Sequence, residues 1–506
     1  MRRDRVYVMF LYGILISLSY LYAQSWGPVI NISNNDSLSE FGYPTFWGIT
    51  AENNGRVHIV WMDQQDPQWA AEVYYRRSLD NGNTFENPVA LTTNSSYWQE
   101  TPCIAHDNFG RLHVVWTEFY YLGALFYPNV YYKRSNDGGA TWETKKLLAP
   151  TYGDFAGNLS LTTDLKNGVY TIYMNQEDPN SWIYDIYLKR SVDGGTTWSP
   201  AYRLTRVTYV GATVYSASVA ADTLNRVHVV WMDDSTGIRQ IYYRRSTNNG
   251  ATFGPKVALT SYNSFKGDVC ISTNRGNIVH VVWEDKRDGN WEIYYRRSTD
   301  GGVNWEAERR LTSTSTSSIT PNITADMQGN VYIVWQEGQE VYFMESNDNG
   351  NSWGQMIPLT SGAIGDYLFP NIAAKYDGEY LHVAWTDKRD GDEDVYYRRR
   401  YPVSAPEKET FSQNYAKILF SSLLFKDKII FNLSLEKVNE VYENTPLKIF
   451  LYNIYGAPVF ESIINSGITT IILEDPKIKN LGKGTYFLKL FSKDEKEIAK
   501  FKLIKF

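Results

Sequence analysis

One short pattern recurs through most of the chain and constrains its fold more than any other feature. An apolar segment ending in tryptophan occurs six times, as in VHVVW, at Trp61, Trp116, Trp231, Trp283, Trp335 and Trp385. The segment VYTIY, which ends at Tyr173, is a degenerate seventh copy, and it brings every spacing to between 50 and 58 residues. Self-similarity at such a period is typical of architectures built from stacked repeats.

Each copy continues in the same way. A polar loop leads to a second apolar strand, such as IYYRRS, and six of these strands run into a turn of the form S-x-D-x-G-x-T-W. The turns begin at Ser78, Ser135, Ser191, Ser246, Ser298 and Ser346, and Asn248 replaces the aspartate in the fourth. We expect the serine and aspartate to bond nearby backbone groups, the glycine to supply a positive φ, and the aromatic residue to pack back on its hairpin. Two further short strands complete the repeat, and four strands in about 50 residues is the size of a propeller blade.

These turns resemble the Asp-box, or BNR, repeat of sialidases and other propeller families, over about residues 26–402. The resemblance implies an all-β β-propeller with the Asp boxes on the face opposite the ligand site, and the seven copies of the repeat predict a seven-bladed ring, whereas sialidases look six-bladed. The seventh repeat ends without such a turn, whereas SWGPVINIS, from Ser25, looks like the strand that normally follows one. We therefore expect the N-terminal strand to close the ring on the last repeat, which leaves no long exposed edge.

The N-terminus has the features of an export signal. Arg2, Arg3 and Arg5 precede an apolar run over residues 6–23. This favours a signal peptide, residues 1–23, cut after Ala23, over an uncleaved membrane anchor. The protein is then expected to be secreted or to lie on the cell surface.

Composition changes sharply near residue 405. All 16 tryptophans lie between Trp26 and Trp385, and no arginine follows Arg400. Such a break marks a domain boundary, so we predict a propeller over residues 24–405 and a small C-terminal β-sandwich over residues 406–506.

The tail resembles the C-terminal sorting domain of the type IX secretion system. The resemblance rests on NIYGAPVF followed by LGKGTYFLKL, with Gly456, Gly484 and Tyr486 as markers. It implies that the outer-membrane secretion machinery is a partner and that the tail is removed on export. An insert over residues 475–479 departs from the pattern, and we expect it to affect a loop only. An ordinary binding β-sandwich is the alternative.

Acidic residues recur on the face opposite the turns. An acid stands two residues after the tryptophan in six repeats, as Asp63, Glu118, Asp233, Asp285, Glu337 and Asp387. A ring of carboxylates could bind a cation or sugar hydroxyls, but repetition favours a structural role, in which each caps backbone amides or pairs with the neighbouring blade's arginine. Two loops, DKRDG, at residues 285–289 and 387–391, add Arg287 and Arg389 to these candidates, although solvated turns are the favoured interpretation of both loops.

Aromatic residues gather in the same loops. The ligand-binding candidates among them are Trp69, Trp98, Trp182 and Trp291. Flat rings beside hydrogen-bonding groups suit sugar rings, although many such residues simply fill space between loops.

No metal or cofactor is expected. The histidines of the VHVVW-type segments are His58, His113, His228, His280 and His382. They occupy equivalent positions in separate blades, which indicates core residues and not a joint metal site. Cys103 and Cys270 are expected to be buried free thiols.

Three functions remain after these observations. A net charge of −6 without a basic cluster makes nucleic acid an unlikely partner. In sialidases an R-I-P motif grips the substrate carboxylate, whereas Tyr43 precedes Pro44 here, so sialidase activity is disfavoured. Binding of glycans or polysaccharide through the loop face, without catalysis, is the leading hypothesis. The alternatives are a glycoside hydrolase or polysaccharide lyase, and a protein-interaction scaffold.

Overall fold

The computed structural model describes residues 24–402 except 35–38, 41–47, 65–70, 94–96, 123–124, 152–158, 177–182, 208–213, 275–276, 364 and 366–367. In the tail it describes 417–420, 424–425, 429–434, 447–453, 458–464, 470–473, 476–481, 484–491 and 497–505. The predicted signal peptide lies outside these residues. No helix among them is long and apolar enough to span a bilayer. The chain divides into two compact units, Met1–Ala405 and Pro406–Phe506.

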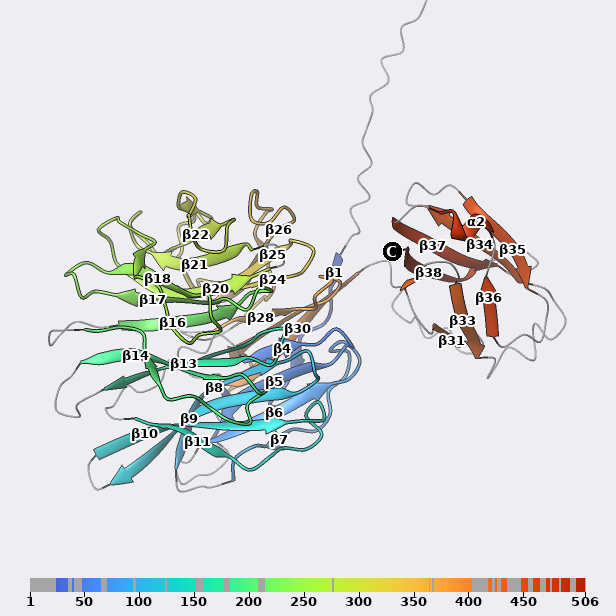
Figure 1. The fold of residues 1–506 in the computed structure, drawn as a ribbon. Coiled ribbons are helices and arrows are strands. Elements are labelled where there is room, and N and C mark those ends of the chain that lie inside the picture. The colour runs from blue at the N-terminus through green and yellow to red at the C-terminus, as the bar shows by residue number, and fades with distance from the viewer. Residues whose placement is uncertain are drawn as a thin grey trace, which may run out of the picture. The chain divides into compact units, whose positions relative to one another are not determined.

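The first unit is a seven-bladed β-propeller, as the repeat predicts (Figure 1). Blade 1 contains β3 (Ser39–Glu40), β4 (Ile49–Ala51), β5 (Val57–Asp63), β6 (Glu72–Ser78) and β7 (Val89–Ala90). Blade 2 contains β8 (Trp98–His106), β9 (Leu112–Leu122), β10 (Leu125–Ser135) and β11 (Lys146–Pro150). Blade 3 contains β12 (Ser160–Thr163), β13 (Val169–Gln176), β14 (Tyr184–Ser191) and β15 (Tyr202–Arg203). Blade 4 contains β16 (Val214–Ala221), β17 (Val227–Asp233), β18 (Gln240–Ser246) and β19 (Val257–Ala258).

The remaining blades follow the same order. Blade 5 contains β20 (Lys266–Thr273), β21 (Val279–Asp285), β22 (Glu292–Ser298) and β23 (Arg309–Arg310). Blade 6 contains β24 (Ser318–Ala325), β25 (Val331–Glu337), β26 (Glu340–Ser346) and β27 (Ile357–Pro358). Blade 7 contains β28 (Asn371–Ala374), β29 (Leu381–Asp387) and β30 (Asp394–Pro402). The innermost strands of successive blades are in contact, and β28 contacts β4, so the ring is closed.

The N-terminal strand completes blade 7. Both β1 (Gln24–Trp26) and β2 (Ile30–Asn31) pair antiparallel with β30. The predicted closure is therefore confirmed, and the first and last described segments of the propeller share one sheet.

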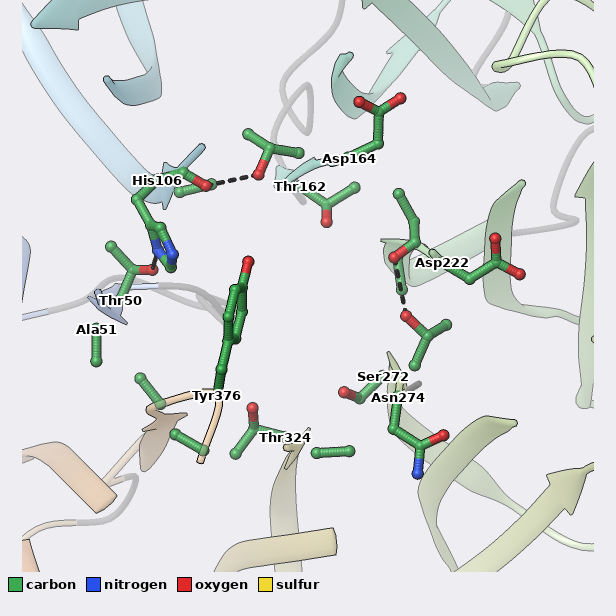
Figure 2. A pocket seen from close by; sticks show the side chains of 18 of the residues that line it. Thr50, Ala51, His106, Thr162, Asp164, Asp222, Ser272, Asn274, Thr324 and Tyr376 are labelled. Carbon is green, nitrogen blue, oxygen red and sulfur yellow. Dashed lines mark hydrogen bonds between the residues drawn. The ribbon is translucent and has the colours of Figure 1, made fainter. Parts of the chain in front are cut away.

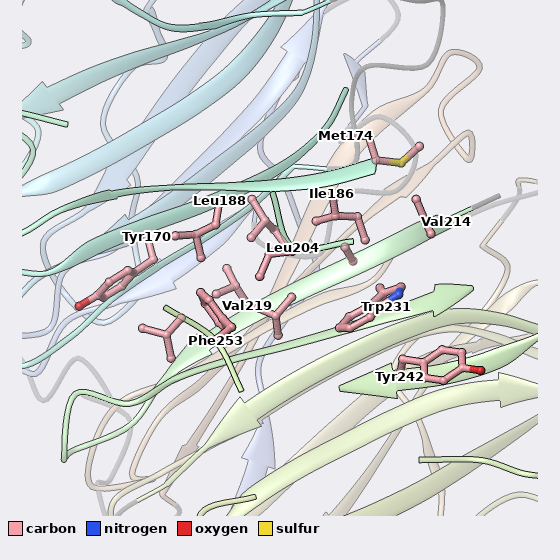
Figure 3. Close-up of a cluster of buried hydrophobic side chains, with 14 of the residues drawn as sticks. Tyr170, Met174, Ile186, Leu188, Leu204, Val214, Val219, Trp231, Tyr242 and Phe253 are labelled. Carbon is pink, nitrogen blue, oxygen red and sulfur yellow. The ribbon is translucent and has the colours of Figure 1, made fainter. Parts of the chain in front are cut away.

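The tryptophan-ending segments form the second strand of each blade, and burial explains their composition. Every residue of β17 is buried, because neighbouring blades cover both faces of the strand. A strand buried on both faces reads as a continuous apolar run and not as an alternating one. Figure 3 shows this packing between blades 3 and 4, where Trp231 and Val219 lie against Ile186 and Leu188.

The Ser-Asp-Gly turns have the expected hydrogen bonds. In blade 5, the hydroxyl of Ser298 donates to Asp300 Oδ1 at 2.8 Å and accepts from the backbone N–H of Gly302 at 2.8 Å. The Asp300 carboxylate also accepts from the backbone N–H of Asn304 at 2.9 Å. Gly302 has a φ of 81°, a conformation that favours glycine.

One expectation about these turns is wrong. The aromatic residue packs on the preceding blade and not on its own hairpin: the Trp305 ring meets Tyr243 edge-on at 4.9 Å. Trp142 meets Tyr75 in the same way, at 5.0 Å. The sequence shows the local turn but not its neighbour, so it could not reveal that each turn fastens two blades together.

We expect Asp300→Ala to lower the free energy of unfolding by about 1–2 kcal/mol, because the side chain caps several groups of the turn. Asp300→Asn is the matched control. Asn248 already holds this position in blade 4, where it accepts from Ser246 Oγ at 2.8 Å and donates to Thr252 Oγ1 at 2.8 Å. Urea denaturation should separate the two variants, and equal losses would contradict the capping role.

The C-terminal unit contains two sheets. One has the order β31 (Lys417–Phe420), β33 (Ile429–Ser434), β36 (Thr470–Leu473). The other has the order β32 (Leu424–Phe425), β38 (Glu497–Lys505), β37 (Gly484–Phe491), β34 (Leu447–Asn453), β35 (Pro458–Ile464). The insert expected to affect a loop only contains the short helix α2 (Pro476–Lys479), whose Ile478 side chain is buried.

Candidate functional site

The two faces of the propeller carry different loops. Strands alternate in direction, so the strand 2–3 loops and the strand 4–1 links share one face, here called the upper face. The Ser-Asp-Gly turns and the strand 1–2 turns share the other, the lower face. The binding candidates of the sequence all belong to upper-face loops.

The recurrent acids are tied into their own blades. Indole N–H groups donate to the acid two residues on, at 3.0 Å for Trp61 to Asp63 and 3.3 Å for Trp283 to Asp285. The same bond recurs at Asp233, Glu337 and Asp387. All six acids are buried. This arrangement supports the structural interpretation of the ring, with the bond to tryptophan as an addition that the sequence did not indicate.

The two DKRDG loops are near copies in structure as well. Asp285 accepts from the backbone N–H of Arg287 at 3.0 Å and pairs with its guanidinium at 2.5 Å. In blade 7, Asp387 accepts from the N–H of Arg389 at 3.0 Å and from its Nε at 2.8 Å. The arginine thus pairs with the acid of its own blade, not with that of a neighbour.

The four tryptophan candidates do not form one group. Trp69 and Trp182 lie outside the described residues. Trp98 belongs to blade 2, where its indole N–H donates to Glu100 at 2.6 Å. Trp291 belongs to blade 5 and lies near Lys286, whose Nζ is 5.8 Å from the ring centre. Among the candidates, the structure therefore pairs Asp285 with Arg287 and Asp387 with Arg389, and Trp291 shares the loop between β21 and β22 with Arg287.

The link between blades 4 and 5 passes beside Asp285 and Arg287 and is held on both sides. The Tyr262 carbonyl accepts from Gln240 of blade 4 at 3.1 Å and from Lys266 Nζ at 2.6 Å. The Ser264 hydroxyl donates to Asp285 at 2.6 Å. The Phe265 carbonyl accepts from the backbone N–H of Lys286 at 2.9 Å. The link is therefore fixed against both blades.

This fixed link presents two aromatic rings to solvent. Tyr262 is 55% exposed and Phe265 is 63% exposed. The guanidinium of Arg239 lies 5.4 Å from the Phe265 ring, and that of Arg287 lies 5.1 Å from the Tyr262 ring. We call the surface formed by Tyr262, Phe265, Arg239, Lys286 and Trp291 the blade 4–5 platform.

Arg239 and Lys286 differ from Arg287 in whether an acidic side chain neutralises their charge. Arg287 pairs with Asp285 and also with Glu308, at 2.6 Å. Within the described part of the chain, neither Arg239 nor Lys286 has a carboxylate within 4.0 Å. The platform therefore combines exposed rings with two cations that are open to a ligand.

Sequence reasoning missed a second acidic group, on the side of blade 5 that faces blade 6. Glu284 is buried, accepts from the backbone N–H of Thr320 at 2.7 Å, and lies over Gly267. Burial and the neighbouring Asp268 carboxylate raise the pKa of Glu284 well above its ordinary value. The signal was present in the repeat, since the other blades have Met, Thr or Gln at this position, as at Met232 and Gln336.

A central pocket opens at the lower end of the channel, at the ends of the innermost strands (Figure 2). All seven blades line it, and its volume is about 180 Å³. Tyr376 projects into it, and its hydroxyl meets Asn108 at 3.2 Å. Asp222 at the rim already pairs with Arg226 and His228. Ligand pockets usually measure roughly 300–1,000 Å³, so this space is small for a site.

The five repeat histidines are core residues, as expected. Each is buried, and its Nδ1 is bonded to a tyrosine hydroxyl at 2.7–2.8 Å. Cys103 and Cys270 are buried free thiols. In the described chain, no three His, Cys, Asp or Glu side chains gather as a metal site would.

These histidines predict a loss of stability in acid. Burial lowers the pKa of His280 and of His382 to about 3, from 6.5 when unfolded. Below pH 6.5 the unfolded chain therefore binds more protons, and stability falls toward pH 3 by up to about 1.4 kcal/mol per pH unit for each histidine. His280→Gln cannot titrate, so its unfolding free energy should fall less steeply with pH in denaturant titrations. Parallel pH profiles would contradict this.

Comparisons with known proteins add similarities of fold. Neither a protein-family model nor a curated protein matches the chain. A protein of unknown function from Dyadobacter fermentans is 12% identical over 75% of this chain and 99% of its own, with a TM-score of 0.49. An ulvan lyase of polysaccharide lyase family PL25 is 12% identical over 71% and 94%, with a TM-score of 0.49. An α-L-arabinanase from Penicillium chrysogenum is 17% identical over 58% and 92%, with a TM-score of 0.43. The assignment of seven blades rests on the strand pairing described above.

Proposed function

We propose that this protein binds carbohydrate through the upper face of its propeller, at the blade 4–5 platform, without transforming it. The observation that carries the proposal is a pair of exposed rings, Tyr262 and Phe265, on a link that both neighbouring blades hold in place. Pre-positioned rings bind with little loss of conformational entropy.

The chemistry of the platform suits a sugar chain. Aromatic faces pack against the apolar faces of sugar rings, while adjacent donors can bond the hydroxyl groups. Arg239 and Lys286 supply such donors beside the rings, and Trp291 extends the aromatic surface into blade 5. The other candidates, Trp98, Asp387 and Arg389, belong to blades 2 and 7, where they would contact a ligand only if it reached across the upper face.

A glycan array probed with the full chain tests the proposal. Tyr262→Ala and Phe265→Ala should each weaken the observed binding about tenfold or more, since stacking contacts of this kind are worth about 1–2 kcal/mol. Phe109→Ala is the matched control: Phe109 is 59% exposed but lies in a lower-face turn. A blank array, or equal effects of all three variants, would overturn the proposal and favour a protein-interaction scaffold.

Glu284 favours one alternative, a glycoside hydrolase or polysaccharide lyase. A buried carboxyl group with a raised pKa is a familiar general acid, and this one adjoins a second carboxylate, Asp268. The test is turnover of the bound polysaccharide, measured as new reducing ends or unsaturated products. Turnover lost in Glu284→Gln while binding remains would establish the enzyme; an activated sialoside should not be hydrolysed, given Tyr43.

We also propose that the turns are Asp boxes and that the chain is exported with a signal peptide and a type IX sorting domain. The bonds of the Ser-Asp-Gly turns and the separate C-terminal unit support this. Intact-mass measurement of the secreted protein should give an end near residues 403–415; a mature form that ends at Phe506 would reject a sorting role for the tail.

A further inference from the structure

A groove lies between blades 3 and 4, and it shares no lining residue with the platform or the central pocket. It has a volume of about 620 Å³, which is within the range of small-molecule sites. The segment around β15 forms one wall, with Tyr202, Arg203 and Arg206, and blade 4 forms the other, with Asp233, Arg244 and Lys256.

The equivalent space in blade 5 is filled by side chains. There Arg287 pairs with Asp285 and Glu308, and its guanidinium lies 4.2 Å from the centre of the Tyr294 ring. Blade 4 has Ser235 where blade 5 has Arg287, and Lys256 where blade 5 has Glu308. In blade 4 Lys256 takes the place of the Arg287 guanidinium, 3.1 Å from Asp233 and 4.0 Å from the centre of the Tyr242 ring. With serine in place of arginine, blade 4 has one long side chain fewer here, and the exchange of an acid for lysine makes the lining more positive.

The groove holds an excess of positive charge. Arg203 pairs with Asp185 at 2.5 Å, and Lys256 pairs with Asp233 at 3.1 Å. Arg244 donates to the carbonyl groups of Leu204 at 2.6 Å and Gly254 at 2.7 Å, and these bonds fix its position without neutralising it.

Arg206 is the cation of the groove that is both exposed and without an acidic partner in the described chain. It is exposed and, among the described residues, has no carboxylate within 4.0 Å. Four basic residues line the groove against one acidic residue, Asp233. This local excess of positive charge contrasts with the net charge of −6 of the whole chain.

We propose that this groove binds an acidic sugar, whose sulfate or carboxylate group is held by Arg206 beside Arg244. Guanidinium groups bind both anions through paired charge-assisted hydrogen bonds. The volume exceeds what a single inorganic anion needs, so the sugar ring enters with its charged group, beside Tyr202. This site does not depend on the platform, and either can fail without the other.

Isothermal titration of the full chain at low ionic strength tests the site with four probes. These are inorganic sulfate, a sulfated galactose oligosaccharide, a galacturonate oligosaccharide and an uncharged galactose oligosaccharide. We expect one or both acidic oligosaccharides to bind more tightly than the uncharged one, and the stronger of the two identifies the anionic group. If inorganic sulfate were the only probe that bound, the groove would be a site for small anions, and the proposal of a sugar ligand would be overturned.

Three variants that each lower the net charge by one distinguish binding in the groove from nonspecific electrostatic attraction. Arg206→Gln should weaken binding of the acidic oligosaccharide about tenfold. Lys166→Gln removes the same charge from an exposed lower-face turn and should change the affinity less than about twofold. The double variant Ser235→Arg/Lys256→Glu also lowers the net charge by one, and it copies the Arg287–Glu308 pair into the groove, so binding should be lost.

Three results would overturn the proposal. They are no binding of either acidic oligosaccharide, affinity unchanged in both groove variants, and equal losses in Arg206→Gln and Lys166→Gln. Tyr262→Ala separates this site from the platform, because it should leave groove binding intact even if it abolishes binding of uncharged glycans.

Discussion

Removal of residues 24–33 is expected to abolish the cooperative unfolding of the propeller. This segment supplies β1 and β2, so its loss leaves the long strand β30 without its outer partner. It also removes Ile32, which is fully buried between blades 7 and 1, and Trp26, whose ring meets Phe343 edge-on at 5.2 Å. Loss of these two side chains alone costs about 5 kcal/mol or more, comparable with the whole stability of many domains.

The closing segment is also held by polar contacts. The Ser33 hydroxyl donates to Asp394 at 2.5 Å and accepts from the backbone N–H of Val395 at 2.9 Å. Thermal unfolding followed by calorimetry and soluble yield measures the effect. Pro28→Ala is the control, because Pro28 is an exposed residue of the same segment. A truncated chain that melts like the full one would show that the ring does not depend on this closure.

Lys266→Met is expected to disable the platform although Lys266 is fully buried and touches no ligand. Its Nζ donates to the Tyr262 carbonyl at 2.6 Å and to Ser264 Oγ at 3.1 Å, and it lies 3.9 Å from Asp285. Methionine removes one of the two donors to the Tyr262 carbonyl, the other being Gln240, and it removes a buried cation beside Asp285. Removal of one partner of a buried pair costs about 3–5 kcal/mol.

Glycan affinity and melting temperature together distinguish a role of Lys266 in positioning the link from a general loss of stability. We expect glycan affinity to fall more than tenfold and the melting temperature to fall as well, since the lost bonds lie between two blades. Lys286→Met removes an exposed lysine of the loop between β21 and β22 and should leave the melting temperature unchanged. If Lys266→Met bound glycans like the parent protein, the link would not need to be held for binding.

The sequence predicted the propeller because the repeat reports the burial pattern directly. A strand with both faces buried, such as β17, must be apolar throughout, and the turn that follows β18 needs Ser246, Asn248 and Gly250 at fixed offsets. Ring closure followed from the missing seventh turn. What the repeat could not show was contact between blades, which is why the packing of Trp305 on Tyr243 was missed.

The site was less predictable for a physical reason. Composition singled out tryptophans and acids, but exposure depends on how a link is held, and the contacts that hold Tyr262 and Phe265 come from two blades. Asp285 was a binding candidate as part of a DKRDG loop, whereas its oxygens already accept bonds from Trp283, Ser264 and Arg287. Glu284 is the better candidate for acid chemistry, and its uniqueness among the repeats was the signal to follow.

Hydrogen–deuterium exchange of the full chain, with and without the oligosaccharide that binds most tightly on the array, tests the platform most directly. Stacking on Tyr262 and Phe265 would shield the link and the loop that follows β21, so we predict slower exchange in residues 261–266 and 286–291. Protection confined to the lower-face pocket around His106 and Tyr376, or no protection in either region, would contradict the proposed site.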